Sequence, residues 1–437
     1  MQSEWPLAPI GEVAQVFDGP HATPKKTSAG PVFLGISSLN NGRLDLSVVE
    51  HLSEDDFTKW TRRVVPQAGD VVFSYETRLG QVAIIPPGLR CCLGRRMALV
   101  RPDRSRLLPR YFLYYFLSDE FQALLKARTI HGSTVERLPL TDFPSYPVRL
   151  PSIETQRQIC DVLAAIDDRI DLLRQTNATL ESIAQALFKS WFIDFDPVRA
   201  KAEGREPEGM DAATAALFPA EFEESALGLI PRGWRAAALA DAVELNPSRS
   251  LPKGVEARYL EMANAPTSGH RPLERVERRA FGSGCKFRNG DALLAKITPC
   301  LENGKSAYVD FLDDLETGWG STEFIVLRAK PVLPQYGAYL LARHEPFRQF
   351  AIQAMTGTSG RQRVELSRLT QFPLALPPDS TIAGAAEATL LALQSRIAAN
   401  DEQAKGLAEL RDTLLPRLIS GRLRLPEAQA QVEEAIA

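Results

Sequence analysis

The chain has 437 residues, of which 44% are hydrophobic and 24% charged, and its formal net charge is −3. This length exceeds one ordinary hydrophobic core and predicts two or three domains, while the composition excludes a disordered or membrane-embedded chain. No run approaches the roughly 20 apolar residues of a membrane span, and residues 1–4 lack the pattern of a signal peptide, so we expect a cytoplasmic protein. The five cysteines have neither disulfide-framework nor zinc-site spacing, so we expect reduced packing residues and no bound metal.

The first 152 residues alternate short strands with loops. Residues 31–36, 68–74, 81–85 and 97–100 are apolar runs bounded by Gly or Pro or basic residues, which predicts strands. A loop at 75–80 carries Arg78 at its tip. The aromatic and leucine content of residues 109–126 predicts a helix that is buried on one face, followed by a loop at 131–134 and a last strand within 143–151.

Residues 153–192 form the next element, one long helix with a coiled-coil seam. Its apolar positions follow one another in alternating steps of four and three, the spacing that faces one partner helix. The seam consists of Ile159, Leu163, Ile166, Ile170, Leu173, Asn177, Leu180, Ala184, Leu187 and Trp191.

A second seam repeats these steps 227 residues later, within a helix expected at 378–424. It consists of Ala386, Leu390, Leu393, Ile397, Asn400, Ala404, Leu407, Arg411, Leu414 and Leu418. The alternative is that each helix packs only on its own domain. The matched periodicity at a fixed offset favours mutual pairing.

Two asparagines predict the register of an antiparallel pair. A buried amide costs stability unless it finds a polar partner, so a core Asn tends to define register. Asn177 occupies an a position and Asn400 a d position. Placing them opposite each other pairs Leu173 with Ala404, Leu180 with Ile397, Ile170 with Leu407, Leu187 with Leu390 and Leu163 with Leu414. The seam would make a rod about 48 Å long at 1.5 Å per residue, which we expect to act as a ruler.

The remaining segments complete a duplication. Residues 193–233, rich in Glu, Pro and Ala, are expected to be a partly ordered linker. The first domain then recurs at 234–377, because Trp234 corresponds to Trp5, residues 290–294 to 69–73, and residues 360–364 to 132–135. Residues 425–437 remain as a C-terminal tail. The predicted fold class is α+β, with two duplicated mixed α/β domains separated by two long antiparallel coiled-coil helices.

Positive charge is concentrated in the two domains. Residues 1–150 carry 18 Lys and Arg against 15 Asp and Glu, and residues 233–376 carry 19 against 15, whereas the helices and the linker are acidic. This distribution is expected if both domains face a polyanion.

Four stretches resemble the specificity subunit of type I restriction-modification systems. They are residues 150–159, 189–198, 227–234 and 410–421, with the sequences LPSIETQRQI, KSWFIDFDPV, LGLIPRGW and LRDTLLPRLISG. The likeness covers nearly the whole chain. It implies two target-recognition domains, 1–152 and 234–377, that each recognise one half of a bipartite double-stranded DNA sequence. It also implies two modification subunits that use S-adenosylmethionine to methylate adenine, and restriction subunits that hydrolyse ATP with Mg and cut DNA, as in anti-phage defence.

Catalytic motifs are missing from the sequence or incomplete in it, which agrees with a binding role. There is no Gly-rich loop ending in Lys-Ser or Lys-Thr that would hold ATP phosphates. Asn246-Pro247-Ser248-Arg249 lacks the second proline and the aromatic residue that adenine methyltransferases use. The chain is therefore expected to be non-catalytic and to bind no cofactor itself. The alternative function is a coiled-coil scaffold whose two α/β domains bind protein rather than DNA.

DNA recognition requires cationic and polar side chains on loops that enter a groove. The first domain offers Lys25, Lys26, Thr77, Arg78, Arg95, Arg96, Ser133 and Thr134. The second offers Arg249, Lys253, Lys296, Thr298, Lys305, Arg361, Gln362 and Arg363. Each of these is either a DNA contact or an ordinary surface side chain, and the loops that recur in both halves are favoured.

Overall fold

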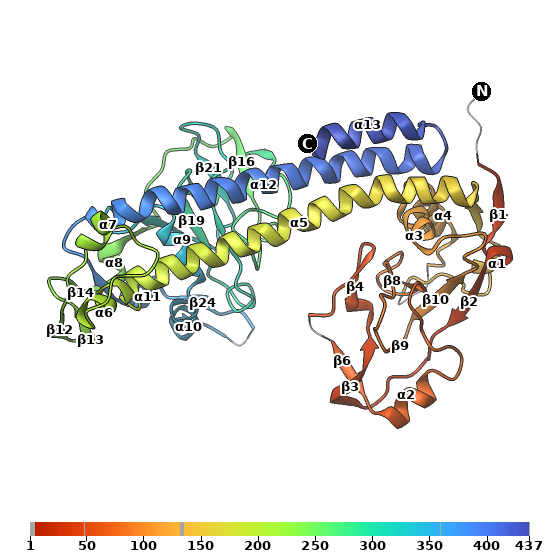
Figure 1. Ribbon diagram of the computed structural model, residues 1–437, viewed down its shortest axis with the longest axis horizontal. Helices are drawn as coiled ribbons and strands as arrows, with labels where there is room; N and C mark the ends of the chain where they lie inside the picture. Colours follow the sequence, from red (N-terminus) through yellow and green to blue (C-terminus); the bar gives the residue numbers. More distant parts are fainter. Residues whose placement is uncertain (1–4, 48, 132–134, 359, 437) are drawn as a thin grey trace. The chain divides into compact units, whose positions relative to one another are not determined.

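The computed structural model describes residues 5–47, 49–131, 135–358 and 360–436 (Figure 1). The chain divides into two compact units, the first made of Met1–Ile170 with Gly406–Ala437 and the second of Asp171–Lys405. Both division points lie inside the long helices α5 (Ile153–Phe192) and α12 (Thr381–Ile419). Each unit therefore contains one α/β domain and one part of each long helix.

The first unit is built on an antiparallel four-stranded sheet in the order β2-β10-β7-β8. Its strands are β2 (Ala14–Asp18), β7 (Val71–Ser74), β8 (Val82–Ile84) and β10 (Met97–Pro102). A second sheet, β6-β3-β9, contains β3 (Lys26–Leu34), β6 (Glu50–Leu52) and β9 (Cys91–Leu93), with β3 and β9 parallel. Two short pairs are β1 (Leu7–Pro9) with β11 (Pro147–Arg149) and β4 (Leu39–Asn40) with β5 (Arg43–Leu44). The helices are α1 (Ile10–Val13), α2 (Glu54–Trp60), α3 (Pro109–Leu117), α4 (Asp119–Arg128) and α13 (Leu425–Ile436), with 3-10 turns η1 (Ile36–Ser38) and η2 (Phe143–Ser145).

The second unit repeats this topology. Its main sheet has the order β15-β22-β19-β20, with β15 (Val243–Leu245), β19 (Asp291–Ala295), β20 (Ser306–Tyr308) and β22 (Phe324–Ala329). A second sheet, β17-β16-β21-β18, contains β16 (Glu256–Leu260), β17 (Arg278–Ala280), β18 (Cys285–Phe287) and β21 (Gly318–Gly320), with β16 and β21 parallel. The main sheets share one strand order, and each second sheet contains one parallel strand pair, although the second domain adds β18. The predicted duplication of mixed α/β domains is therefore confirmed.

The remaining elements of the second unit are short. The strands are β12 (Phe222–Ser225), β13 (Gly228–Pro231), β14 (Arg235–Ala238), β23 (Met355–Thr356), β24 (Arg363–Val364) and β25 (Pro373–Leu376). The helices are α6 (Asp196–Ala202), α7 (Ala212–Ala216), α8 (Leu239–Ala242), α9 (Gly337–Arg343), α10 (Glu345–Gln353) and α11 (Leu366–Leu369).

The aromatic segment 109–126 is two helices rather than the single one expected. Ser118 adopts an extended backbone between α3 and α4, and its hydroxyl accepts a hydrogen bond from the amide of Phe121. A serine followed by Asp119 and Glu120 is a strong helix N-cap, and this local preference starts a new helix. Both helices bury their aromatic side chains, and Phe116 and Phe143 pack on Phe73 of the sheet, with ring centroids 5.4 and 4.5 Å away.

Residues 193–233 are ordered, in contrast to the partly ordered linker expected. The segment contains α6, α7 and the β12–β13 hairpin. Its few apolar side chains are inserted into the core of the second unit, where Val198, Phe218 and Ile230 are 0%, 2% and 4% exposed. Phe218 meets Trp191 of α5 edge to face, with ring centroids 5.2 Å apart. The Glu-, Pro- and Ala-rich composition concealed these anchors because they are widely spaced rather than periodic. The C-terminal segment, expected to be a tail, is likewise helical as α13, since Ala428 and Val432 are buried.

The two long helices lie side by side and run antiparallel (Figure 1). Asn177 of α5 is hydrogen bonded to Asn400 of α12, and Asp167, earlier in α5, forms an ion pair with Arg411, later in α12. Seam residues such as Leu163, Ile170, Ile397 and Leu414 are at most 3% exposed. The helix pairing expected from the two matched seams is confirmed.

Each domain is attached to the helices of its own unit by buried polar contacts. In the first unit, the Tyr114 hydroxyl of α3 donates to Asp167 at 2.7 Å. In the second, the Tyr339 hydroxyl of α9 donates to Glu181 at 2.7 Å, and Gln394 of α12 donates to Asp310 at 2.6 Å. Burial raises the pKa of Tyr114 and of Tyr339, so both hydroxyls remain protonated donors.

Candidate nucleic-acid interface

In the second unit, two loops far apart in sequence form one surface. The residues after β19 pair with the β23–β24 hairpin: the Val364 amide donates to the Lys296 carbonyl at 2.9 Å, and the Thr298 amide donates to the Gln362 carbonyl at 3.1 Å. The Gln362 amide also donates to the Thr298 hydroxyl at 3.1 Å. We call this surface the second recognition patch. It brings together five of the expected site residues, which are Lys296, Thr298, Arg361, Gln362 and Arg363.

The first unit makes the same junction. Here the loop after β7 meets the segment after α4. The Leu138 amide donates to the Tyr75 carbonyl at 2.9 Å, and the backbones of Glu76 and Arg137 form an isolated antiparallel β-bridge. We call the surface formed by residues 75–80, 95–96 and 137 the first recognition patch. It contains Thr77, Arg78, Arg95 and Arg96 of the expected set. Ser133 and Thr134 lie outside the described residues.

An ion pair between Arg363 and Glu323 orients a guanidinium of the second patch. Arg363 donates from Nε and Nη2 to the carboxylate of Glu323 at 2.7–3.2 Å, and its side chain remains 46% exposed. The Arg363 hydrogen bond holds the pKa of Glu323 below its ordinary value, with the charges of Arg363, Lys296 and Arg361 acting in the same direction against a smaller desolvation effect. The carboxylate therefore stays ionised and orients a guanidinium that is still accessible. Arg361 is exposed beside it.

Two residues of the first patch, Thr77 and Arg96, have a strained backbone conformation. Thr77 and Arg96 have φ values of 69° and 71°, in the left-handed region that non-glycine residues rarely adopt. Arg96 holds the loop through an ion pair with Glu76 at 2.8 Å and a hydrogen bond to the Thr77 hydroxyl at 3.1 Å. These contacts leave Arg78 and Arg95 exposed beside the strained loop.

Other expected site residues lie away from the patches or are engaged internally. Arg249 forms a bidentate ion pair with Asp291 at 2.9 Å, and the two side chains are only 11% and 0% exposed. Lys305 donates to the carbonyls of Met262 and Ala263 at 2.7 and 3.2 Å, which fixes a loop. Both side chains are thus engaged within the domain in this structure, and the expectation that Arg249 and Lys305 contact DNA stays a prediction. Lys26 is paired with Glu50, whereas Lys25 and Lys253 are exposed outside both patches.

Sequence reasoning did not single out Arg137. Its backbone takes the place in the first patch that Arg363 takes in the second, because the Glu76–Arg137 and Ile297–Arg363 bridges are equivalent. The two arginines are separated by nearly the same offset as the two helices. That offset was the signal that could have identified Arg137.

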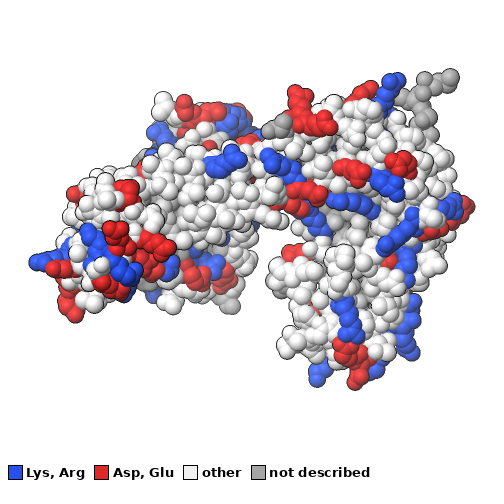
Figure 2. Space-filling model, in the orientation of Figure 1, with Lys and Arg blue, Asp and Glu red and all other residues white. Residues whose placement is uncertain are grey.

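The visible surface mixes both signs of charge. Figure 2 shows Lys and Arg side chains interspersed with Asp and Glu over the face seen, rather than one uniformly basic expanse. In the part of the chain that the structure describes, no group of three or more His, Cys, Asp or Glu side chains has the arrangement of a metal site. Among the same residues, no helix is both long and apolar enough to cross a membrane.

Comparison with known proteins identifies the family. The family described as the type I restriction modification DNA specificity domain matches residues 2–182. The chain is 24% identical over 394 residues to the type I restriction enzyme HindI specificity subunit of Haemophilus influenzae, covering 76% of this chain and 81% of that protein. It is 23% identical over 388 residues to the MjaIX specificity subunit of Methanocaldococcus jannaschii, covering 86% and 82%. Residues 2–182 belong to the type I restriction modification DNA specificity family. The relatives that match most of the chain are specificity subunits, the non-catalytic members of their systems.

One solved structure of the family also aligns with it. The crystal structure of a type I restriction-modification system S subunit from M. genitalium has a TM-score of 0.49 and 14% identity, over 95% of this chain and 96% of that one. The region matched by the family, residues 2–182, includes the first recognition patch and the first three quarters of α5. In this chain, the candidate interface consists of two patches of matching construction, one in each unit.

Proposed function

We propose that this specificity subunit recognises a bipartite double-stranded DNA sequence, one half through each recognition patch. The observation that carries the proposal is the repeated junction of the loop after the Gly-Asp strand with the segment after the helix pair. Each junction presents exposed arginines, Arg78 and Arg95 in one and Arg361 and Arg363 in the other. Arginine is the side chain that most often recognises guanine edges and also binds phosphate.

We propose further that the long helices separate the two half-sites and hold the partner subunits. The partners in this proposal are two modification subunits that methylate adenine with S-adenosylmethionine and restriction subunits that hydrolyse ATP with Mg. The specificity subunit would hold neither cofactor. Its contribution is to place the modification subunits at defined distances from the two half-sites.

Methylome sequencing of a host with and without this chain tests the proposal directly. The expected result is adenine methylation at one sequence made of two short defined parts and an undefined gap, present only when the chain is expressed. A gel shift with duplex DNA in a salt series separates the proposal from a scaffold that binds only protein, because phosphate neutralisation makes DNA affinity fall steeply with salt. Absence of duplex binding at low salt, together with an unchanged methylome, would support the protein scaffold instead.

A further inference from the structure

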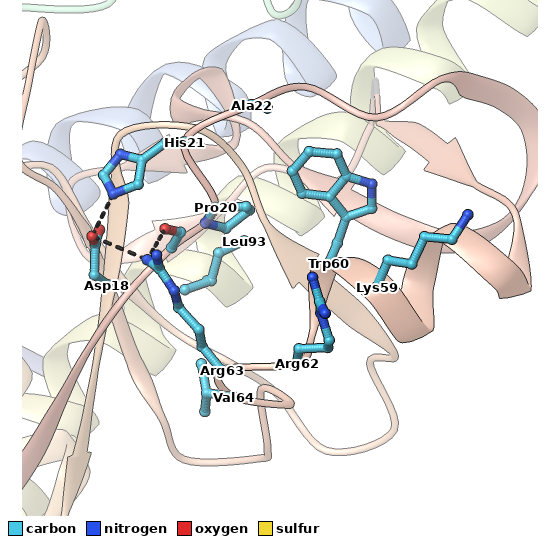
Figure 3. A pocket seen from close by; sticks show the side chains of 11 residues that line it. Asp18, Pro20, His21, Ala22, Lys59, Trp60, Arg62, Arg63, Val64 and Leu93 are labelled. Atoms are coloured by element: carbon cyan, nitrogen blue, oxygen red, sulfur yellow. Dashed lines mark hydrogen bonds and ion pairs between the residues drawn. The ribbon is translucent and has the colours of Figure 1, made fainter.

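A surface pocket of about 340 Å³ lies in the first unit beside the first recognition patch. The loop after β2 forms one side, with Asp18, Pro20 and His21, and the end of α2 with the residues after it forms the other. In Figure 3, His21 and Arg63 gather around Asp18 on one side, and Trp60 and Lys59 stand on the other. Two segments that are distant in sequence thus enclose one opening.

The lining has more positive than negative groups. The single carboxylate, Asp18, is already shared by three donors: His21 at 2.7 Å, Arg63 at 3.2 Å and the Tyr75 hydroxyl at 3.1 Å. Arg62 is exposed, and among the described residues no hydrogen bond or ion pair engages its guanidinium. Lys59 is 69% exposed, and its contact with Asp56 is long, at 3.5 Å. The pocket therefore offers two cations for an external anion.

The pocket is coupled to the first recognition patch through two contacts. Tyr75, whose hydroxyl binds Asp18, is the first residue of the loop that carries Thr77 and Arg78. The Gly19 amide donates to the Met97 carbonyl at 3.0 Å, next to Arg96. Burial and the neighbouring Asp18 raise the pKa of Tyr75, so the linking hydrogen bond keeps its proton. The pocket therefore adjoins the two segments that carry the arginines of the patch.

The basic side chains at the corresponding loop of the second unit are engaged within the domain. After β15, Arg249 turns inward to Asp291, and Lys286 donates to the Arg249 carbonyl at 3.1 Å. In the first unit, by contrast, Lys59 and Arg62 at the end of α2 line the open pocket opposite the loop after β2. The two domains therefore differ in this feature although their main sheets match.

We infer that this pocket seats one backbone phosphate of the DNA strand that flanks the half-site recognised by the first domain, with Arg62 and Lys59 as its cations. The inference rests on the proposed function. A phosphate contact positions a protein on the duplex and carries no base information. The apolar walls, Pro20, Trp60 and Leu93, suit the sugar that precedes such a phosphate, and the open rim admits a continuous strand. The same chemistry would fit a free mononucleotide, which the experiment includes as a competitor.

The test measures the salt dependence of duplex binding by the full chain, for wild type and Lys59→Ala/Arg62→Ala. One lost phosphate contact is expected to reduce the slope of log affinity against log salt by about 0.9, and affinity falls equally on target and unrelated duplexes. Arg62→Lys with Lys59 intact should keep the wild-type slope, because a point charge suffices for phosphate. The matched control is Arg205→Ala, an exposed cation of the second unit, which should leave the slope unchanged.

The outcomes distinguish a failure of the proposed DNA recognition from a failure of the proposed phosphate contact. Wild-type chain without salt-dependent duplex binding would refute the proposed function itself. If the wild type binds duplex DNA with the expected salt dependence but the double variant has the same slope as Arg205→Ala, the phosphate contact in the pocket is refuted while the proposed function stands. A lower ratio of target to unrelated affinity in the double variant would also overturn it, since the pocket would then recognise bases. Competition by a deoxynucleoside monophosphate at micromolar concentration, lost in the double variant, would assign the pocket to a free nucleotide and overturn the strand contact.

Discussion

The side-chain amide of Asn400 donates a hydrogen bond to the side-chain oxygen of Asn177, with 2.9 Å between Nδ2 and Oδ1. Asn177 in turn donates to the backbone carbonyl of Ile397 at 3.1 Å. Asn400 is 2% exposed, so its amide has left water and depends on this partner. The pair lies between aliphatic seam residues, where a shift of one heptad would leave each amide facing a hydrocarbon side chain.

The asparagine pair should behave as a coupled unit. Asn177→Leu leaves the buried amide of Asn400 without its partner and is expected to cost about 1–3 kcal/mol of unfolding free energy. Asn400→Leu should cost less, because the half-buried Asn177 keeps its hydrogen bond to the Ile397 carbonyl. The double Leu variant should cost less than the sum of the single variants, because no amide remains unsatisfied. Urea denaturation of the four proteins measures the coupling. Additive effects would show that the hydrogen bond does not define the register.

Helix length should set the gap in the recognised DNA sequence. Inserting one heptad into both α5 and α12 preserves the seam and lengthens each helix by about 10 Å. We expect the methylated sequence to keep both defined halves while the gap widens by roughly one to three base pairs. Replacing a heptad by another of equal length and pattern is the control and should leave the gap as it was. An unchanged gap after insertion would reject the ruler.

Each domain should specify its own half of the target. Replacing residues 234–376 by the matching segment of another specificity subunit leaves the first recognition patch intact. The methylome should then change in one half of the sequence only. A change in both halves would contradict independent recognition by two patches.

Two arginines of the second patch should contribute directly to specific binding. Arg361→Ala and Arg363→Ala are each expected to weaken target binding by roughly 5- to 150-fold if the guanidinium contacts a base edge, and by less if it contacts only phosphate. Arg205→Ala, an exposed cation outside the patch and outside the predicted DNA-binding set, is the control. Fluorescence anisotropy with target and unrelated duplexes distinguishes the two cases. If neither arginine variant differs from the control, the β23–β24 hairpin lies outside the interface.

Acid should destabilise the second unit through Asp310. This carboxylate is buried, which by itself raises its pKa, but the hydrogen bond and charge of His270, the charge of Arg271 and the hydrogen bond from Gln394 together lower it. A carboxylate with a lowered folded pKa adds stability above its unfolded pKa of about 3.8, and this stability is lost as pH falls through the folded value. Asp310→Asn should lower the melting temperature at neutral pH, and the difference from wild type should shrink below about pH 4. Melting curves recorded from pH 7 to 2 would contradict this if the two proteins stayed equally far apart.

The periodic parts of the sequence determined most of the architecture. Seam residues at steps of four and three, repeated at one offset, predicted both long helices and their antiparallel pairing, because one-dimensional spacing defines which face of a helix is apolar. The Asn177 and Asn400 positions then indicated a register, since a buried amide has few favourable partners. The recurring Gly-Asp strands predicted the duplication for the same reason.

Only the tertiary structure decided what non-periodic residues do. Val198, Phe218 and Ile230 order the segment 193–233 through contacts with α5 and the second domain, which composition alone does not reveal. Arg249, on a loop, and Arg363, at the start of β24, look alike in the sequence, yet Arg249 neutralises a buried carboxylate and Arg363 stays exposed beside Glu323. A side chain's availability to DNA depends on which carboxylate the fold brings to it, and that partner lies about 40 residues away in either case. The pocket between the loop after β2 and the end of α2 has the same origin, because its two walls become neighbours only when the domain folds.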